Sequence, residues 1–364
     1  MLVYHRRGLR SLGRPRDLLR RMGTEWARVH ESASIETGDL TEPLRRIGLL
    51  EAGEPARLTP LTGGVSSDIS LVETGGRRFC VKRALPRLKV AALWEAPVGR
   101  NAAEAAYMRA VARWLPHAVP RILGEDAEEG WFAMDYLAPE DHPLWNARLL
   151  AGIVEVDFAA TVGRDLAIIH ARSAADPNIP AAFANDETFE AIRIEPYLRA
   201  TGRAHPQLAA RFDELARTTL TTKRALVHGD ISPKNILQAP AGPVFLDAEC
   251  AWFGDPAFDL AFCLNHLLLK GAREGADRTH YKDAFFALAG AYLAGVDWES
   301  ATEIEARAAA LLPALFLARI DGKSPVEYLT RESERAAVRR CAIPMIADPP
   351  PRVKDIADAW ERER

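Results

Sequence analysis

Hydrophobic and polar positions divide the chain into two parts with different patterns. Between residues 56 and 136, short apolar or alternating runs are separated by Gly, Pro and charged residues, which predicts β-strands. These runs cover about residues 56–61, 68–73, 78–82, 121–123 and 131–136. After residue 139, apolar positions recur mostly at helical spacing. The pattern predicts an α+β fold in which a small β-rich part precedes a larger helical part.

Helices are predicted where apolar residues lie three or four positions apart. The stretches are residues 101–115, 158–172, two helices within 186–222, 255–270, 280–294, 298–320 and 325–341, and a short helix begins near Thr41. Asp255 followed by Pro256 is a typical helix start, and Gly271 suits the helix end. This helix is apolar on nearly all sides, so we expect it to be buried. Asp297 is expected to cap the helix at 298–320.

Two aspartates follow short apolar runs in residues 226–260, LVHGDISPKNILQAPAGPVFLDAECAWFGDPAFDL. The runs predict buried strands, so Asp230 and Asp247 should lie just past strand ends, with Asn235 between them. Phosphoryl transfer from ATP needs a carboxylate that orients the attacking hydroxyl, and a carboxylate and an amide that hold Mg²⁺. The three side chains supply that set in that order. Asp and Asn are also common turn residues, so a purely structural loop is the alternative.

A second polar motif precedes a strand lysine. Gly63 and Gly64 allow a tight turn whose N–H groups could contact phosphate oxygens, and Ser66 and Ser67 add donors. A plain hairpin is the alternative, and no Gly-Lys-Ser/Thr follows, which excludes a Walker A loop. Lys82 ends the predicted strand at 78–82. A cation there could neutralise ATP phosphates if an acidic partner held its flexible stem.

The motifs in residues 226–260 form a recognisable set. The set is His228-Gly229-Asp230, Asn235, Asp247-Ala248-Glu249 and Asp259. It resembles the catalytic and metal-binding loops of the aminoglycoside phosphotransferase and choline kinase family, a branch of the protein-kinase-like fold. The Asp-x-Glu form at Asp247 is closer to choline and methylthioribose kinases than to the aminoglycoside enzymes.

The resemblance implies a bilobal α+β structure. A basic N-terminal extension would cover residues 1–39, a nucleotide-binding N-lobe residues 40–138, and a helical C-lobe with the catalytic loop and acceptor site residues 139–364. Residues 1–31 carry eight arginines and no acidic residue before Asp17. A targeting peptide, a basic arm and a translation start at Met22 remain open for this segment, and we favour a poorly packed extension.

The resemblance also implies roles around ATP and Mg²⁺. Asp230 would orient the acceptor hydroxyl and receive its proton late. Asn235 and Asp247 would bind Mg²⁺, and Glu249 would reach a second metal or its water. Lys82 would clamp the phosphates.

Other implied roles surround the nucleotide and support the loop. Glu104 in the helix at 101–115 would fix Lys82, with Glu95 as the second choice. Gly63, Gly64, Ser66 and Ser67 would cover the nucleotide, and Met134 and Tyr136 would lie in a hinge at the adenine edge. His228 and Asp259 would be structural, with Asp259 hydrogen-bonded to backbone beneath the catalytic loop. Arg339 and Arg340 resemble the paired arginines near the sugar in methylthioribose kinases, although such pairs are usually solvated.

Composition narrows the partners. The net charge of −3 gives no general attraction to nucleic acid or to an anionic membrane. No apolar run is long enough to span a bilayer. The four cysteines lack a C-x-x-C pair, which predicts reduced core thiols in a cytoplasmic protein. The expected partners are ATP and a small-molecule alcohol acceptor, and a homodimer is left open.

We interpret the sequence as an ATP- and Mg²⁺-dependent phosphotransferase acting on a small-molecule hydroxyl. The insert at 186–222 is charge-balanced, and Arg331 and Arg335 precede Arg339, so a sugar-like polyhydroxyl acceptor is favoured over an aminoglycoside. Choline-type and other amino-alcohol acceptors stay open, because Trp145 or Trp252 could stack on a quaternary ammonium. A protein kinase is disfavoured, since His-Arg-Asp and Asp-Phe-Gly are absent. A non-catalytic nucleotide-binding scaffold is the remaining alternative.

Overall fold

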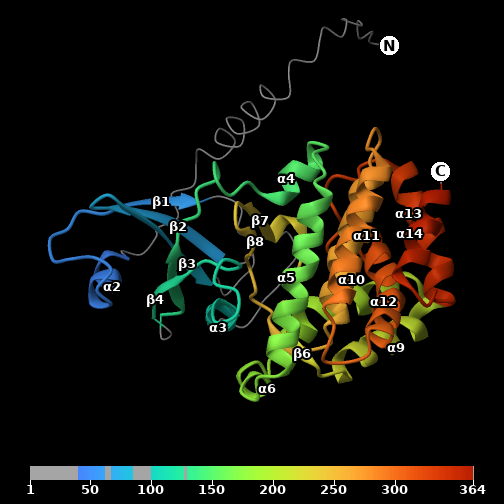
Figure 1. Cartoon of the computed structure of the whole chain (residues 1–364), viewed down its shortest axis with the longest axis horizontal. Coiled ribbons are helices and arrows are strands. Elements are labelled where there is room, and N and C mark those ends of the chain that lie inside the picture. Colours follow the sequence, from blue (N-terminus) through green and yellow to red (C-terminus); the bar gives the residue numbers. More distant parts are fainter. Residues whose placement is uncertain (1–39, 62–66, 85–99, 127–128, 364) are drawn as a thin grey trace, which may run out of the picture. The chain divides into compact units, whose positions relative to one another are not determined.

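The computed structural model describes residues 40–61, 67–84, 100–126 and 129–363 (Figure 1). The described residues fall into two units that divide between residues 52 and 53. In the first unit, the short helix α2 (Thr41–Arg46) buries Leu44. The predicted extension at 1–39 lies outside the described residues. The division of the second unit into lobes at residue 138 stays a prediction.

Five antiparallel strands form one sheet in the order β1-β2-β3-β5-β4. The strands are β1 (Arg57–Leu61), β2 (Ser67–Thr74), β3 (Arg77–Ala84), β4 (Ile122–Asp126) and β5 (Trp131–Asp135). All five predicted strands are present. β3 is central, and it sets Lys82 opposite Ile69 of β2 and Phe132 of β5. Helix α3 (Arg100–Ala112) contacts β3, β4 and β5.

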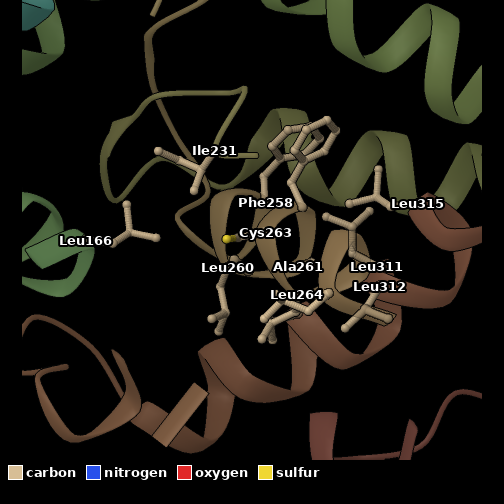
Figure 2. Close-up of a cluster of buried hydrophobic side chains, with 14 of the residues drawn as sticks. Leu166, Ile231, Phe258, Leu260, Ala261, Cys263, Leu264, Leu311, Leu312 and Leu315 are labelled. Carbon is tan, nitrogen blue, oxygen red and sulfur yellow. The ribbon is translucent and has the colours of Figure 1, made fainter. Parts of the chain in front are cut away.

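A buried helix lies at the centre of the helical part. All residues of α10 (Ala257–Gly271) are buried, as the all-round apolar pattern predicts. It packs against α11 (Arg278–Ala294) and α12 (Ala301–Asp321), and α11 packs on α5 (Val156–Ala174). Figure 2 shows Cys263 of α10 among leucines that come from α10, α12 and α5.

Short elements complete the chain. The helices are α4 (Trp145–Leu150), α6 (Ile179–Ala182), α7 (Asp186–Phe189), η1 (Glu190–Arg199), α8 (Ala200–Ala204), η2 (Pro206–Leu208), α9 (Ala209–Thr221), η3 (Pro233–Asn235), α13 (Glu332–Ala347) and α14 (Val353–Arg362). Two small antiparallel sheets pair β6 (Ala225–Val227) with β9 (Trp252–Gly254), and β7 (Ile236–Ala239) with β8 (Gly242–Phe245). No helix within the described ranges has both the length and the apolar character to cross a membrane.

Several predicted helix ends are wrong by a few residues. Ser300 caps α12, because its Oγ accepts a hydrogen bond from Glu303 N–H, so Asp297 does not. Helix α13 begins at Glu332 instead of near residue 325, because the Glu334 carboxylate accepts from the N–H of Arg331 and fixes the start there. Gly271 is the last residue of α10 and does not follow it. Helix α14 is absent from the predicted set.

Candidate active site

The loop after β6 is held from below by α10. Asp259 of α10 is fully buried, and its carboxylate accepts hydrogen bonds from the N–H groups of His228 at 2.7 Å and Gly229 at 2.8 Å. Gly229 has φ of +80°, and a Cβ there would lie 2.8 Å from Cys250 Sγ, so glycine is required. Asp259 therefore lies where the sequence predicts it, beneath the loop and bonded to its backbone.

His228 fixes the next turn of this loop. Its Nδ1 accepts a hydrogen bond from the N–H of Asp230 at 3.1 Å, and its Nε2 lies 3.1 Å from the carbonyl oxygen of Leu246. These partners require the neutral tautomer with the proton on Nε2. Burial lowers the pKa of His228, against the raising effect of Asp259, and so favours that neutral form.

The carboxylate of Asp230 has two different oxygens. Oδ2 lies 3.0 Å from Arg193 Nη2 and 3.3 Å from Lys234 Nζ. Oδ1 is buried and has no hydrogen-bond partner among the residues that the structure describes. An oxygen held in place in this way, with its lone pairs unused, can accept a hydrogen bond from an incoming hydroxyl group.

Sequence reasoning missed Arg193 and Lys234, the two cations that contact Asp230. Arg193 lies in η1, a π-helix, and its guanidinium also donates to the carbonyl oxygens of Gly229 and Ile192. In the sequence, Arg193 is one of the basic residues that offset the acidic residues of the insert at 186–222. The available signal is its position between Ile192 and Ile194, because an arginine inside an apolar run usually has a buried partner.

Three charged side chains, of which Lys82 and Glu104 are buried and Asp247 is partly exposed, join the sheet to the loop after β8. Lys82 Nζ lies 2.6 Å from Glu104 Oε2 and 2.6 Å from Asp247 Oδ1. Burial alone would lower the pKa of Lys82, but the two carboxylates raise it above its ordinary value. Burial opposes the ionisation of Asp247, yet Lys82 and Lys234 hold its pKa below the usual range. The predicted pairing of Lys82 with Glu104 is thus present in the structure, and Asp247 shares the same cation.

Asn235 connects the loop that carries Asp230 to the segment that precedes Asp247. Asn235 Nδ2 donates a hydrogen bond to the backbone carbonyl oxygen of Asp230 at 3.1 Å. The backbone carbonyl oxygen of Asn235 accepts a hydrogen bond from the N–H of Leu246 at 2.9 Å. Asp247 has φ of +67°, and it is the one non-glycine residue with positive φ in the described part of the chain. Such strain is concentrated at functional positions. Asn235 therefore links the segments that carry Asp230 and Asp247, as the order of the three residues in the sequence predicts.

The oxygen ligands of Asp247 and Asn235 suit Mg²⁺ that is also bound by phosphates better than a metal ion bound by protein side chains alone. The described ranges contain no group of three His, Cys, Asp or Glu side chains that could hold a metal ion. Mg²⁺ is usually bound through one or two carboxylates together with phosphates and water, and Asp247 and Asn235 offer such a partial set. Glu249 lies 2.9 Å from Arg100 Nε of α3, and burial raises its pKa. Its metal role stays a prediction.

The remaining predicted residues have varied surroundings. Gly63, Gly64 and Ser66 lie outside the described residues, and Ser67 is buried at the start of β2. Met134 lies opposite Cys80 in the sheet. Tyr136 follows β5, and the Arg78 guanidinium lies 5.0 Å from its ring centroid. Their contacts with a nucleotide stay predictions.

The paired arginines of α13 have acidic partners away from the catalytic loop. Arg339 pairs with Asp321 at 2.7 Å and with Glu332 at 2.6 Å, and Arg340 pairs with Glu363. None of these partners belongs to the predicted site. The structure therefore does not bring Arg339 and Arg340 together with Asp230, and their role in acceptor binding has no support from these contacts.

Comparison with known families gives the class of this protein. Residues 57–302 match the family described as "Phosphotransferase enzyme family", whose model is abbreviated APH. That match covers more than half of the chain, including the strands of the five-stranded sheet, the loop after β6 and α10. The chain belongs to this phosphotransferase family.

Individual relatives give a narrower likeness. The methylthioribose kinase of Pectobacterium carotovorum subsp. carotovorum is 27% identical over 223 residues, which is 54% of this chain and 55% of the relative. That of Erwinia tasmaniensis is 26% identical over 64% of this chain and 62% of its own length. The chain therefore spans only about half to two thirds of these relatives.

A solved structure supports the fold. The amicoumacin kinase hAmiN, in complex with AMP-PNP, Ca²⁺ and Ami, is similar with a TM-score of 0.56 at 13% identity. The likeness covers 88% of this chain and 97% of that one. It confirms the predicted kinase-like α+β fold.

Proposed function

We propose that this protein is an ATP- and Mg²⁺-dependent phosphotransferase that acts on a hydroxyl group of a small polyhydroxyl compound. The observation that carries the proposal is the arrangement around Asp230, whose Oδ1 is buried and unpaired in the described structure while Oδ2 is held by two cations. The family and the relatives named methylthioribose kinase support it.

Each part of the site has a task in this reaction. Asp230 orients the acceptor hydroxyl and takes its proton late, because the transition state of phosphoryl transfer is loose. Lys82, held by Glu104, neutralises phosphate oxygens of ATP. Mg²⁺, when bound by Asp247 and Asn235, supplies further charge neutralisation at the phosphates. The protein contributes mainly by positioning the groups that react.

Arg193 and Lys234 complete the arrangement from the acceptor side. Both contact the same oxygen of Asp230, so they restrict the rotation of its carboxylate. Arg193 also ties η1 to the carbonyl oxygen of Gly229. The insert that the sequence assigns to the acceptor region is thereby connected to the proposed catalytic residue itself.

The two tryptophans that could stack on choline, Trp145 and Trp252, are both buried. Trp145 is 1% exposed and packs against Phe158, and Trp252 is fully buried and stacked on Phe189 at 4.0 Å. Neither ring offers a face to an acceptor. We also propose that the protein acts in the cytoplasm, which is supported by its four buried free thiols; a homodimer stays a prediction.

The test is a screen of sugars, amino alcohols and aminoglycosides for ADP release by the wild type and by Asp230→Asn. We expect at least one polyhydroxyl acceptor to give ADP release that depends on Mg²⁺ and on Asp230. Failure of every acceptor, or equal release by the Asp230→Asn variant, would contradict the proposal. A thermal shift with ATP that does not depend on Mg²⁺ would favour the non-catalytic scaffold instead.

A further inference from the structure

Two buried cations on the neighbouring helices α10 and α12 differ from the other buried cations. Lys82, Arg100 and Arg193 each contact a carboxylate, at 2.6, 2.9 and 3.0 Å respectively. Lys270 is 1% exposed and Arg319 is 9% exposed, but neither forms an ion pair with any carboxylate in the described part of the chain. Arg319 Nη1 donates hydrogen bonds to the carbonyl and hydroxyl oxygens of Ser324, which are neutral. Burial of a cation without a counter-charge is strongly unfavourable. Packing alone therefore does not explain this pair.

Unused hydrogen-bond donors surround the same two cations. His266 Nε2, Arg319 Nε and Tyr328 OH are buried without a hydrogen-bond partner among the described residues. His266 lies one turn before Lys270 on α10, so the two side chains share a face of the helix. Lys270 Nζ lies 4.4 Å from the centroid of the Tyr328 ring. Arg319 Nε–H, Tyr328 O–H and the Nε2–H tautomer of His266 can each donate a hydrogen bond to the oxygens of an anionic group.

The π-helix η1 connects these donors to the catalytic loop. Arg193 of η1 contacts Asp230, and four residues later Tyr197 OH accepts a hydrogen bond from Arg319 Nη1 at 3.3 Å. The ring of Tyr197 packs on Phe262, which in turn packs on His266. Tyr197 therefore connects Arg319 to the same helix whose Arg193 contacts Asp230.

We propose that His266, Lys270 and Arg319 bind an anionic group of the acceptor while Asp230 receives the acceptor hydroxyl. The inference rests on the phosphotransferase function proposed above, and it specifies the acceptor as a hydroxy compound that carries a carboxylate or a phosphate. The anion accepts hydrogen bonds from the unused donors and compensates the buried charge. The fork of Arg319 suits both kinds of anion. Arg339, by contrast, already has carboxylate partners.

The charge of Lys270 makes this binding depend on pH. Burial, followed by the charges of Arg273 and Arg319, lowers the pKa of Lys270 to about 7. The groups that affect it or lie beside it are Cys263, His266, Arg273, Arg319, Glu327 and Tyr328. Because the ammonium form binds an anion and the neutral amine does not, KM for an anionic acceptor should rise as pH increases through neutrality.

The first experiment compares three acceptors with one carbon skeleton. Xylitol, xylonate and xylitol 5-phosphate are offered with Mg-ATP to the wild type, to Lys270→Met and to Lys354→Met, an exposed control on α14. We expect kcat/KM of the wild type to be at least about tenfold higher for one of the anionic acceptors than for xylitol. Lys270→Met should remove most of that preference through KM and abolish the rise of KM with pH, whereas Lys354→Met should keep both.

A second experiment measures binding of inorganic phosphate by calorimetry and needs no turnover. The wild type and Lys354→Met should bind phosphate, and Lys270→Met should bind it at least about tenfold more weakly. The thermal midpoint of Lys270→Met should rise, because the variant removes an uncompensated buried charge. A lower midpoint with unchanged acceptor preference would make Lys270 merely structural and overturn the inference.

The outcomes separate this inference from the proposed function. Equal use of the three acceptors would overturn the anion site and leave the phosphotransferase intact. Absence of ADP release with every acceptor, together with phosphate binding that depends on Lys270, would overturn the phosphotransferase and keep the anion site. Absence of both would overturn both.

Discussion

Replacement of Arg193 with methionine should separate the positioning of Asp230 from the binding of nucleotide. Arg193 Nη2 contacts Asp230 Oδ2 at 3.0 Å. The same guanidinium donates hydrogen bonds to the backbone carbonyl oxygen of Gly229 and to that of Ile192. Methionine fills a similar length but has no donor. The variant would leave the buried carboxylate with Lys234 as its remaining cationic contact in the described structure.

The magnitude follows from burial. The Arg193 side chain is 8% exposed, so solvent screens the contact little. Removal of one partner from a buried ion pair costs about 3–5 kcal/mol, and we expect about 2–4 kcal/mol because Lys234 still compensates part of the charge. A displacement of about 1 Å in a positioned group can lower kcat about a hundredfold. Affinity for Mg-ATP should change little, since Lys82 and Asp247 keep their contacts.

The assay compares kcat, Mg-ATP affinity and the thermal midpoint of Arg193→Met with those of Arg203→Met. Arg203 belongs to the same insert, but its contact with Glu195 is on the surface, with 59% of the arginine side chain exposed. Loss of such a pair costs about 0–1 kcal/mol. If Arg193→Met matched Arg203→Met in both kcat and stability, Arg193 would not position Asp230.

Three further substitutions test other parts of the account. Gly229→Ala should lower stability by about 1–3 kcal/mol in denaturant unfolding, because φ is +80° and the added Cβ would meet Cys250 Sγ; wild-type stability would refute the strain. Glu249→Gln should raise the Mg²⁺ concentration needed for half-maximal ADP release, whereas an unchanged titration with lower stability would leave Glu249 as the ion-pair partner of Arg100. In the folded state the pKa of Lys270 is about 7, against about 10.4 unfolded, so the unfolded state binds more protons between these values and stability should rise with pH across that window. Lys270→Met should flatten that rise in unfolding curves from pH 7 to 10, and an equally steep rise would contradict the assignment.

The hydrophobic pattern of the sequence predicts the secondary-structure elements that depend on neighbouring residues in the chain. The five strands follow from short alternating runs between turn residues, and the burial of α10 follows from its all-round apolar pattern. Asp230 and Asp247 were predicted to follow strand ends because each comes soon after an apolar run. The structure then brings them together through Asn235, which is bonded to both loops.

Contacts between distant segments could not be predicted from these patterns. Arg193 contacts Asp230 because η1 packs on the loop after β6, and the spacing of residues along the chain does not predict that packing. The neighbouring Arg340 makes Arg339 resemble an acceptor-binding residue in the sequence, but the packing of the helices places Asp321 2.7 Å from Arg339. The burial of Trp252 likewise depends on Phe189, far away in the sequence. Pairing through space therefore decides which polar and aromatic residues reach the site.

The most direct test of the central claim is the comparison of Asp230→Asn with Asp247→Asn in turnover and in Mg-ATP binding. Asp230→Asn should lower kcat about a hundredfold or more while Mg-ATP affinity stays near that of the wild type, because a positioned base contributes on that order. Asp247→Asn should lose Mg-ATP binding and turnover together. Wild-type turnover in Asp230→Asn with the best acceptor would contradict the role of Asp230 and with it the proposed phosphotransferase site.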